Sequence, residues 1–223
     1  MSIQGAQQFV FGFWQGKPVK CEAVEEHLSS DGGLFVFGQL DEKLGWTASF
    51  AQQILEPRSA RLHSALSIIR QRVFGIIAGY EDQNDHDTLR SDPIFKLLTQ
   101  RHPTDDEDLA SQPTISRLEN SVTAGDLRRL EDWFIDCFVA SFDEEPRELT
   151  LDIDTFDDPT HGEQQLTLFH NFYKQYQYQV RVITCANNDM VVLPVLLYGT
   201  APVALGAADD LRRVIERLRE RFP

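Results

Sequence analysis

The sequence predicts an α+β fold, with helices in the first two thirds of the chain and a strand, a β-hairpin and a helix in the last third. Apolar residues recur mostly at helical spacing before residue 145 and with period two after Pro146. The turn sequence Asn187-Asn188-Asp189 separates two runs rich in Val, Ile and Leu, which indicates a hairpin. The length of 223 residues suits one large domain or two small ones.

A short strand is expected over residues 9–14, and helices over residues 34–44, 47–55, 61–78, 88–99 and about 121–142. Pro113 favours a further short helix through Glu119, because proline is tolerated in a first turn. The residues expected to face the core in the two clearest helices are Leu34, Phe37, Leu40 and Leu44, and Leu62, Ala65, Leu66, Ile69, Val73, Ile76 and Ile77.

The pattern in the last third alternates from residue 149 to residue 154, as in a strand with two different faces. Leu149, Leu151 and Ile153 share one face, and Asp152 and Asp154 share the other. Apolar runs at 178–186 and 190–198 predict the hairpin strands, and the proline inside the second run predicts an edge position or a bulge. Residues 207–221 form an amphipathic helix pattern.

Composition excludes several classes of protein. No apolar run approaches the ~20 residues of a membrane span, and no basic segment precedes an apolar one, so neither membrane insertion nor a signal peptide is expected. Three scattered cysteines argue against a disulfide framework and a clustered zinc site, and fit the cytoplasm. The net charge of −14 argues against nucleic-acid binding, but residues 81–120 (−6) and 121–165 (−10) hold the excess.

The sharpest chemical feature is the strand Leu151-Asp152-Ile153-Asp154-Thr155. Two carboxylates on one strand face, ~5–7 Å apart, repel unless solvent, an arginine or a cation balances them. Carboxylate oxygens are the ligands that Mg²⁺ takes, so a metal site is one interpretation. A solvent-facing acidic strand is the other. The order strand, hairpin, helix is that of the beginning of a ribonuclease-H-like sheet, a fold that gathers carboxylates around two Mg²⁺ ions.

From about residue 28 onward, the sequence resembles the N-terminal half of a bacterial DDE transposase of insertion-sequence group 1380. The stretches that carry the resemblance are Asp31-Gly32-Gly33-Leu34, Gly79-Tyr80-Glu81-Asp82-Gln83-Asn84-Asp85-His86-Asp87-Thr88-Leu89-Arg90-Ser91-Asp92-Pro93, Ala110-Ser111-Gln112-Pro113-Thr114-Ile115-Ser116-Arg117-Leu118-Glu119-Asn120, Leu151-Asp152-Ile153-Asp154-Thr155 and His161-Gly162-Glu163-Gln164.

The resemblance implies cut-and-paste DNA transposition by a catalytic domain in which two Asp and one Glu hold Mg²⁺. Asp154 maps to the first Asp, as catalytic residue and metal ligand, and Asp152 is the second choice. The other two acids are expected beyond Pro223, so the chain is expected to be a truncated, inactive fragment. The partners implied are DNA, at the terminal inverted repeats of a mobile element, and further copies of the intact enzyme. The alternative is a non-catalytic DNA-binding or dimerising remnant.

The expected organisation is an undefined lead-in over residues 1–27, a helical and possibly DNA-binding region over residues 28–145, and the beginning of a ribonuclease-H-like domain over residues 146–223. A helix-turn-helix that starts near residue 110 would turn Arg117, Arg128 and Arg129 toward phosphate, and an ordinary helix pair is the other interpretation. A second basic stripe could include Arg58, Arg61, Arg70 and Arg72. The polar loop at residues 81–87 favours caps and turns over a metal loop.

Overall fold

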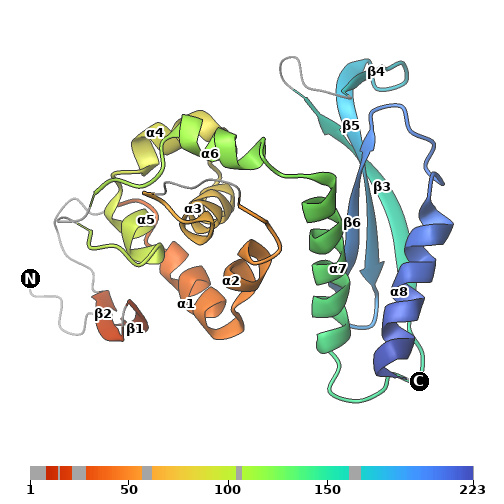
Figure 1. Cartoon of the computed structure of the whole chain (residues 1–223), viewed down its shortest axis with the longest axis horizontal. Coiled ribbons are helices and arrows are strands. Elements are labelled where there is room, and N and C mark those ends of the chain that lie inside the picture. The colour runs from red at the N-terminus through yellow and green to blue at the C-terminus, as the bar shows by residue number, and fades with distance from the viewer. Residues whose placement is uncertain are drawn as a thin grey trace, which may run out of the picture. The chain divides into compact units, whose positions relative to one another are not determined.

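The structure is a computed structural model, and it describes residues 9–14, 16–21, 29–56, 62–103, 107–160 and 167–222 (Figure 1). Two compact units divide the chain, a helical unit of Met1–Asp126 and a sheet unit of Leu127–Pro223. Arg58, Arg61 and the stretch 161–164 lie outside the described residues. Within the described residues, no helix has both the length and the apolar character needed to cross a bilayer.

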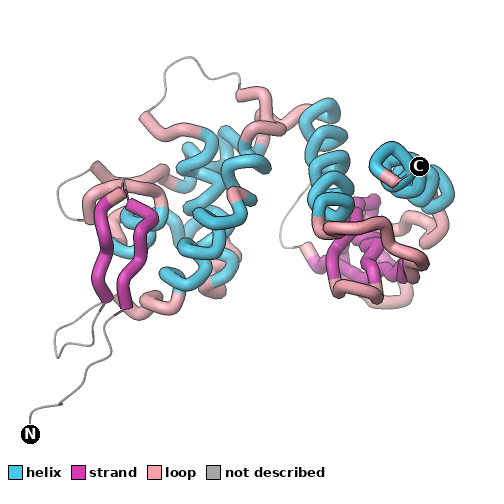
Figure 2. Tube along the Cα trace, turned by 90° about the horizontal axis from the view of Figure 1, so that it is seen from below, coloured by secondary structure: helices cyan, strands magenta, loops and turns pink. Residues whose placement is uncertain are grey.

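The helical unit begins with an antiparallel hairpin, which confirms the strand expected at residues 9–14 and adds a partner strand. Several short helices follow, and α1 begins and ends at the expected residues. Figure 2 shows the hairpin beside these helices. The elements are β1 (Phe9–Trp14), β2 (Lys17–Cys21), α1 (Leu34–Leu44), α2 (Trp46–Ala51), α3 (Ala65–Ile77), η1 (Gln83–Asp85), α4 (His86–Leu89), α5 (Pro93–Leu98) and α6 (Gln112–Glu119).

The faces that α1 and α3 bury differ from those expected. Phe37, Leu40 and Leu44 of α1 are exposed, as are Ile76 and Ile77 of α3. The expectation was wrong because polar side chains of these helices face inward, where each has partners. The buried residues are Leu34, Phe35, Gly38 and Asp41 in α1, and Ile68, Ile69, Arg70, Gln71, Phe74 and Gly75 in α3.

The helix expected over residues 88–99 is two helices, because Asp92 and Pro93 begin a new one. Oδ1 of Asp92 accepts hydrogen bonds from the backbone N–H of Ile94 at 2.8 Å and of Phe95 at 3.3 Å. An N-cap residue followed by proline is a strong start signal for a helix, so α5 begins here instead of continuing α4.

Two acids of the loop at residues 81–87, Asp82 and Asp87, have the cap and turn role that was favoured. Asp82 accepts a hydrogen bond from the backbone N–H of Asn84 at 2.9 Å, at the start of η1. Asp87 accepts one from the backbone N–H of Gln112 at 2.9 Å, at the start of α6. Each carboxylate therefore satisfies a backbone donor that the helix itself leaves unpaired.

The sheet unit consists of one antiparallel sheet and two helices, as Figure 2 shows with both helices on one side of the strands. Its central strand, β5, pairs with β3 on one side and with β6 and the short β4 on the other. Pro194 lies in β6, which pairs only with β5 among the described strands. The elements are α7 (Ala124–Ala140), β3 (Leu151–Pro159), β4 (Leu168–His170), β5 (Gln175–Cys185), β6 (Met190–Tyr198) and α8 (Ala207–Arg221).

The core of the sheet unit lies between the two helices and one face of the sheet. Its fully buried members come from α7, β5, β6 and α8. In α7 the most buried apolar residues are Ile135, Phe138 and Val139, so the whole unit, α7 included, forms one core around the sheet. The opposite face of the sheet has no helix over it among the described residues.

We expect a buried histidine to make the helical unit less stable in acid. The His86 side chain is fully buried, its Nδ1 lies 3.4 Å from Nε2 of Gln71, and its Nε2 has no hydrogen-bond partner among the described residues. Burial lowers the pKa of His86, and the nearby charge of Arg72 lowers it further.

The folded unit therefore binds the His86 proton less readily than the unfolded chain, whose histidines titrate at about 6.5. Stability is complete above that pH and falls as the pH drops below it. We expect a lower denaturant midpoint at about pH 5.5 than at about pH 7.5, and a smaller difference in His86→Gln. His170→Gln, in the sheet unit, is the control and should leave the drop intact; an unchanged drop in His86→Gln would contradict the assignment.

Candidate metal-binding face

Strand β3 places Asp152 and Asp154 on the uncovered face of the sheet. Its register pairs Ile153 with Ile183, whose side chain is buried beneath the helices, and pairs Asp154 with Val182. Directly paired residues project from the same side of a sheet, and neighbours along a strand alternate. Both carboxylates are therefore on the face away from α7 and α8, and both residues are exposed.

Strand β3 is also an edge strand, since it pairs only with β5 among the described strands. Oδ1 of Asp154 accepts a hydrogen bond from the backbone N–H of Thr155 at 2.8 Å, which orients the carboxylate. Across the ladder, Asp152 faces Thr184. The rigid strand, the exposed carboxylates and the open edge leave room for a cation and for further ligands beside Asp154.

The donors on this face fit a weakly held Mg²⁺ and not a complete cage. Among the described residues, no three His, Cys, Asp or Glu side chains form a group that could enclose a metal ion. Mg²⁺ is commonly bound through one or two carboxylates, with waters and substrate phosphates as its other ligands. Asp154, with Asp152 beside it, can supply that minimum, whereas clamping two ions requires further carboxylates.

Three of the arginines considered for DNA contact, Arg70, Arg72 and Arg128, have acidic partners among the described residues. Arg70 is buried and paired with Asp41 and Glu42, and Arg72 pairs with Glu119 at 3.3 Å. The basic stripe expected from these residues is therefore wrong for Arg70, because its guanidinium does not reach solvent.

Two arginines of α8, Arg213 and Arg217, face acids of α7 in the same way. Arg213 contacts Glu131 and Asp132, each at 2.6 Å, and Arg217 contacts Asp136 at 3.0 Å. Burial opposes the charged form of Arg213, yet its hydrogen bonds to Asp132 and Glu131 raise its pKa. These acids thus stabilise the helix pair, and part of the negative charge of residues 121–165 is internally balanced.

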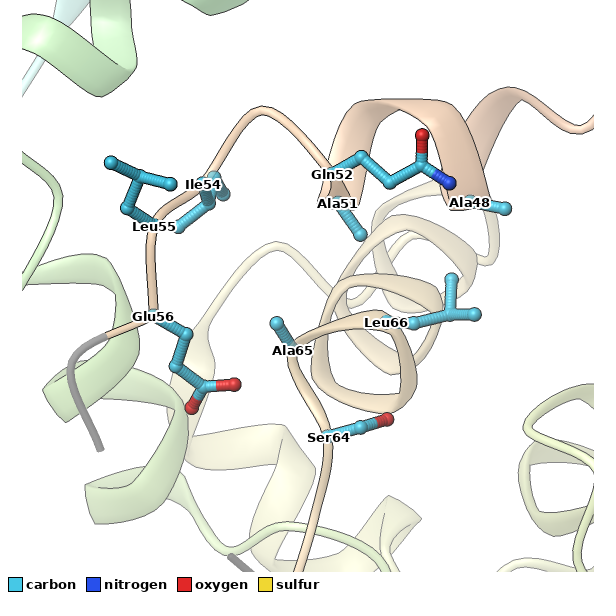
Figure 3. A pocket seen from close by; sticks show the side chains of 9 residues that line it. All are labelled: Ala48, Ala51, Gln52, Ile54, Leu55, Glu56, Ser64, Ala65 and Leu66. Atoms are coloured by element: carbon cyan, nitrogen blue, oxygen red, sulfur yellow. The ribbon is translucent and has the colours of Figure 1, made fainter. Parts of the chain in front are cut away.

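The pocket in Figure 3 does not bring two carboxylates together as β3 does, since Glu56 is the one acid among its described lining residues. It lies between α2 and the start of α3, measures about 380 Å³ and opens to solvent. Small and apolar side chains form most of its lining, together with Gln52, Glu56 and Ser64. The strand carboxylates, and not this pocket, are the candidate site.

The chain matches the family model described as transposase DDE domain group 1 over residues 11–223. It belongs to this family. No curated protein and no solved structure matches the chain. DDE transposases act on DNA and generally use divalent metal ions, and the α+β sheet unit is compatible with their ribonuclease-H-like domain. The acidic overall charge therefore does not exclude nucleic acid.

In the sheet unit of this DDE transposase domain, sequence reasoning missed three further features. The strand β4 is too short for a period-two pattern to reveal it. The pairing of Arg181 with Asp210 joins residues far apart in the sequence. The third feature is a cluster of exposed aromatic side chains at the β4–β5 turn, which the sequence shows as the run Phe169-His170-Asn171-Phe172-Tyr173-Lys174-Gln175-Tyr176.

Proposed function

We propose that the chain is part of a Mg²⁺-dependent DNA transposase of insertion-sequence group 1380, in which Asp154 is a metal ligand and Asp152 supports it. The observation that carries this is the pair of exposed carboxylates on the uncovered face of an edge strand, in a chain of the DDE family. The DNA would be the terminal inverted repeats of a mobile element, bound by an oligomer of the intact enzyme. Residues 28–145 would contribute DNA recognition, and residues 146–223 the first catalytic strand.

The metal, when bound, would stabilise negative charge on the phosphate that is attacked. The chain's own contribution is positional. The strand fixes the backbone of Asp154, the N–H of Thr155 holds one carboxylate oxygen, and the other oxygen is left for the ion. The Asp154 side chain is exposed, so a cation can reach its carboxylate from solvent.

The test is Mn²⁺ titration of the chain, followed by the paramagnetic broadening of backbone amide signals. We expect broadening centred on residues 152–156, and its loss in Asp154→Asn, because the amide oxygen keeps the shape but not the charge. Asp158→Asn is the matched control, since Asp158 lies on the same strand and face. Broadening that persists in Asp154→Asn would refute the site.

A second readout of the same variant concerns catalysis. We propose that residues 1–223, assayed by themselves with Mg²⁺ and terminal-repeat DNA, do not cleave or join strands, because Asp154 and Asp152 cannot clamp two ions. Robust cleavage that disappears in Asp154→Asn would show instead that these residues suffice. Salt-sensitive binding to the repeats without cleavage would leave the non-catalytic DNA-binding alternative in place.

A further inference from the structure

The turn between β4 and β5 carries an unusual density of exposed aromatic rings. Four side chains, which we call the aromatic tip, are exposed by 42% (Phe169), 80% (Phe172), 49% (Tyr173) and 58% (Tyr176). Phe172, at 80% exposure, buries too little of its ring to stabilise the fold appreciably. A cluster of such residues, unlike a single one, indicates a surface that binds something.

The rings of the aromatic tip are held against one another. The Phe169 and Tyr176 centroids lie 5.4 Å apart, and the Phe172 and Tyr173 centroids lie 5.0 Å apart with the ring planes perpendicular. The ring of His170 lies 5.0 Å from that of Tyr173. Edge-to-face contacts of this kind orient each ring while leaving ring surface open to a further planar group.

The register places part of the aromatic tip on the same face of the sheet as Asp154. Phe169 pairs directly with Tyr176, and Tyr176 is six residues from Val182, the partner of Asp154. Since strand residues rise by about 3.3 Å, the tip lies roughly 20 Å from Asp154 along the strand.

The charge of the turn suits a polyanion. From Thr167 to Val180 the sequence has no Asp or Glu, and it includes His170 and Lys174. Lys174 is exposed and adopts a φ of 57°, in the left-handed region, and its N–H donates to the carbonyl of His170 at 2.8 Å, which closes the turn. The nearest carboxylates belong to β3: Asp158 lies opposite Tyr178 on this face of the ladder, and Asp157 accepts a hydrogen bond from Nε2 of Gln175 at 2.7 Å.

We propose that the aromatic tip binds unpaired bases of DNA by stacking them on its rings, with Lys174 directed at the phosphates. Base faces are hidden inside a duplex, so exposed rings can stack only on bases that have left it. Every base has such a face, and the contact therefore tolerates any sequence. The inference rests on the proposed function only in that the ligand is DNA.

The experiment measures binding of the full chain to an oligothymidylate of about a dozen nucleotides that contains one 2-aminopurine, in EDTA. We expect binding with a change in 2-aminopurine fluorescence. Phe172→Ala and Tyr173→Ala should each weaken binding by about fivefold or more, and together should abolish the fluorescence change. Phe37→Ala, which removes a ring of the helical unit that is 46% exposed, close to the exposure of Tyr173, is the control and should bind like wild type.

Two conservative substitutions at Phe172 distinguish aromatic stacking from a general apolar contact. Phe172→Tyr should keep the affinity and the fluorescence change, and Phe172→Leu should lose both. Wild-type binding by the double alanine variant, or by Phe172→Leu, would overturn the proposal. Self-association of the chain that the alanine variants abolish, without any effect on oligonucleotide binding, would assign the aromatic tip to a second copy and would also overturn it.

This experiment contains DNA and no metal, whereas the Mn²⁺ titration contains metal and no DNA. Failure of the Mn²⁺ titration with retained oligonucleotide binding would remove the metal site and keep the aromatic tip. The reverse result would keep the metal site and remove the stacking surface.

Discussion

Arg181→Met is expected to lower the free energy of unfolding of the sheet unit by about 3–5 kcal/mol. The Arg181 side chain is 1% exposed, in the central strand β5 and under the helices. Its guanidinium pairs with Asp210 in the first turn of α8 and donates to the carbonyl of Leu205 at 2.5 Å and of Val203 at 3.4 Å. Methionine fills a similar volume but leaves these acceptors and a shielded carboxylate without a donor.

Urea unfolding followed by circular dichroism measures the effect. Arg212→Met is the matched control, because Arg212 pairs with Asp209 in the same helix while both side chains are largely exposed. An exposed pair contributes about 0–1 kcal/mol, so this control should stay close to wild type. Equal losses in the two variants would contradict the argument that burial, and not pairing alone, makes Arg181 important.

The same contact links the core to the candidate site. Arg181 pairs across the ladder with Thr155, the neighbour of Asp154, so the residue that fixes the start of α8 also lies directly beside β3 in the sheet. This link could not be read from the sequence, where Asp210 reads as an ordinary favourable acid at a helix N-terminus. A long-range ion pair has no local signature, in contrast to a cap or a turn.

Local signals predicted several elements correctly. Helices α1 and α8 and strand β6 occupy the expected residues, and the Asn187-Asn188-Asp189 turn joins β5 and β6. These elements have strong periodicity or turn chemistry, which act within a few residues. The face of β3 that carries Asp152 and Asp154 was also predicted, because a strand alternates strictly once its register is fixed by Ile153.

The buried faces of the N-terminal helices were not predictable in this way. Helical periodicity predicts that the most apolar face of a helix is buried, so it does not predict a buried face that carries an acid or an arginine. Asp41, Arg70 and Gln71 are buried because each finds a partner on another segment, and those partners are contributed by tertiary contacts. Because these polar side chains occupy the buried faces, apolar residues on the other faces, among them Phe37 and Leu40, are exposed.

The second large effect is expected from this inward-facing network. Asp41 is 7% exposed; its Oδ1 accepts the backbone N–H of Thr47 at 2.8 Å, at the start of α2, and its Oδ2 accepts the Thr47 hydroxyl at 2.5 Å. Nε of Arg70 lies 3.3 Å from the same carboxylate. Asp41→Ala should destabilise the helical unit by about 3–5 kcal/mol, since it leaves the buried guanidinium and two donors with fewer acceptors.

Denaturant unfolding of the variants distinguishes a paired charge from a mere polar residue. Glu119→Ala is the control. It removes the acid of the Arg72–Glu119 pair, which lies in the same unit and is more exposed than the Asp41–Arg70 pair, and it should lower the free energy of unfolding by about 0–1 kcal/mol. The double variant Asp41→Leu with Arg70→Met should lose less free energy of unfolding than the single variants Asp41→Leu and Arg70→Met lose in total. In the double variant two apolar side chains replace the pair, whereas each single variant leaves one buried charge without its partner. Strict additivity would mean that the carboxylate and the guanidinium do not depend on each other. The burial of the polar faces of α1 and α3 would then need another cause.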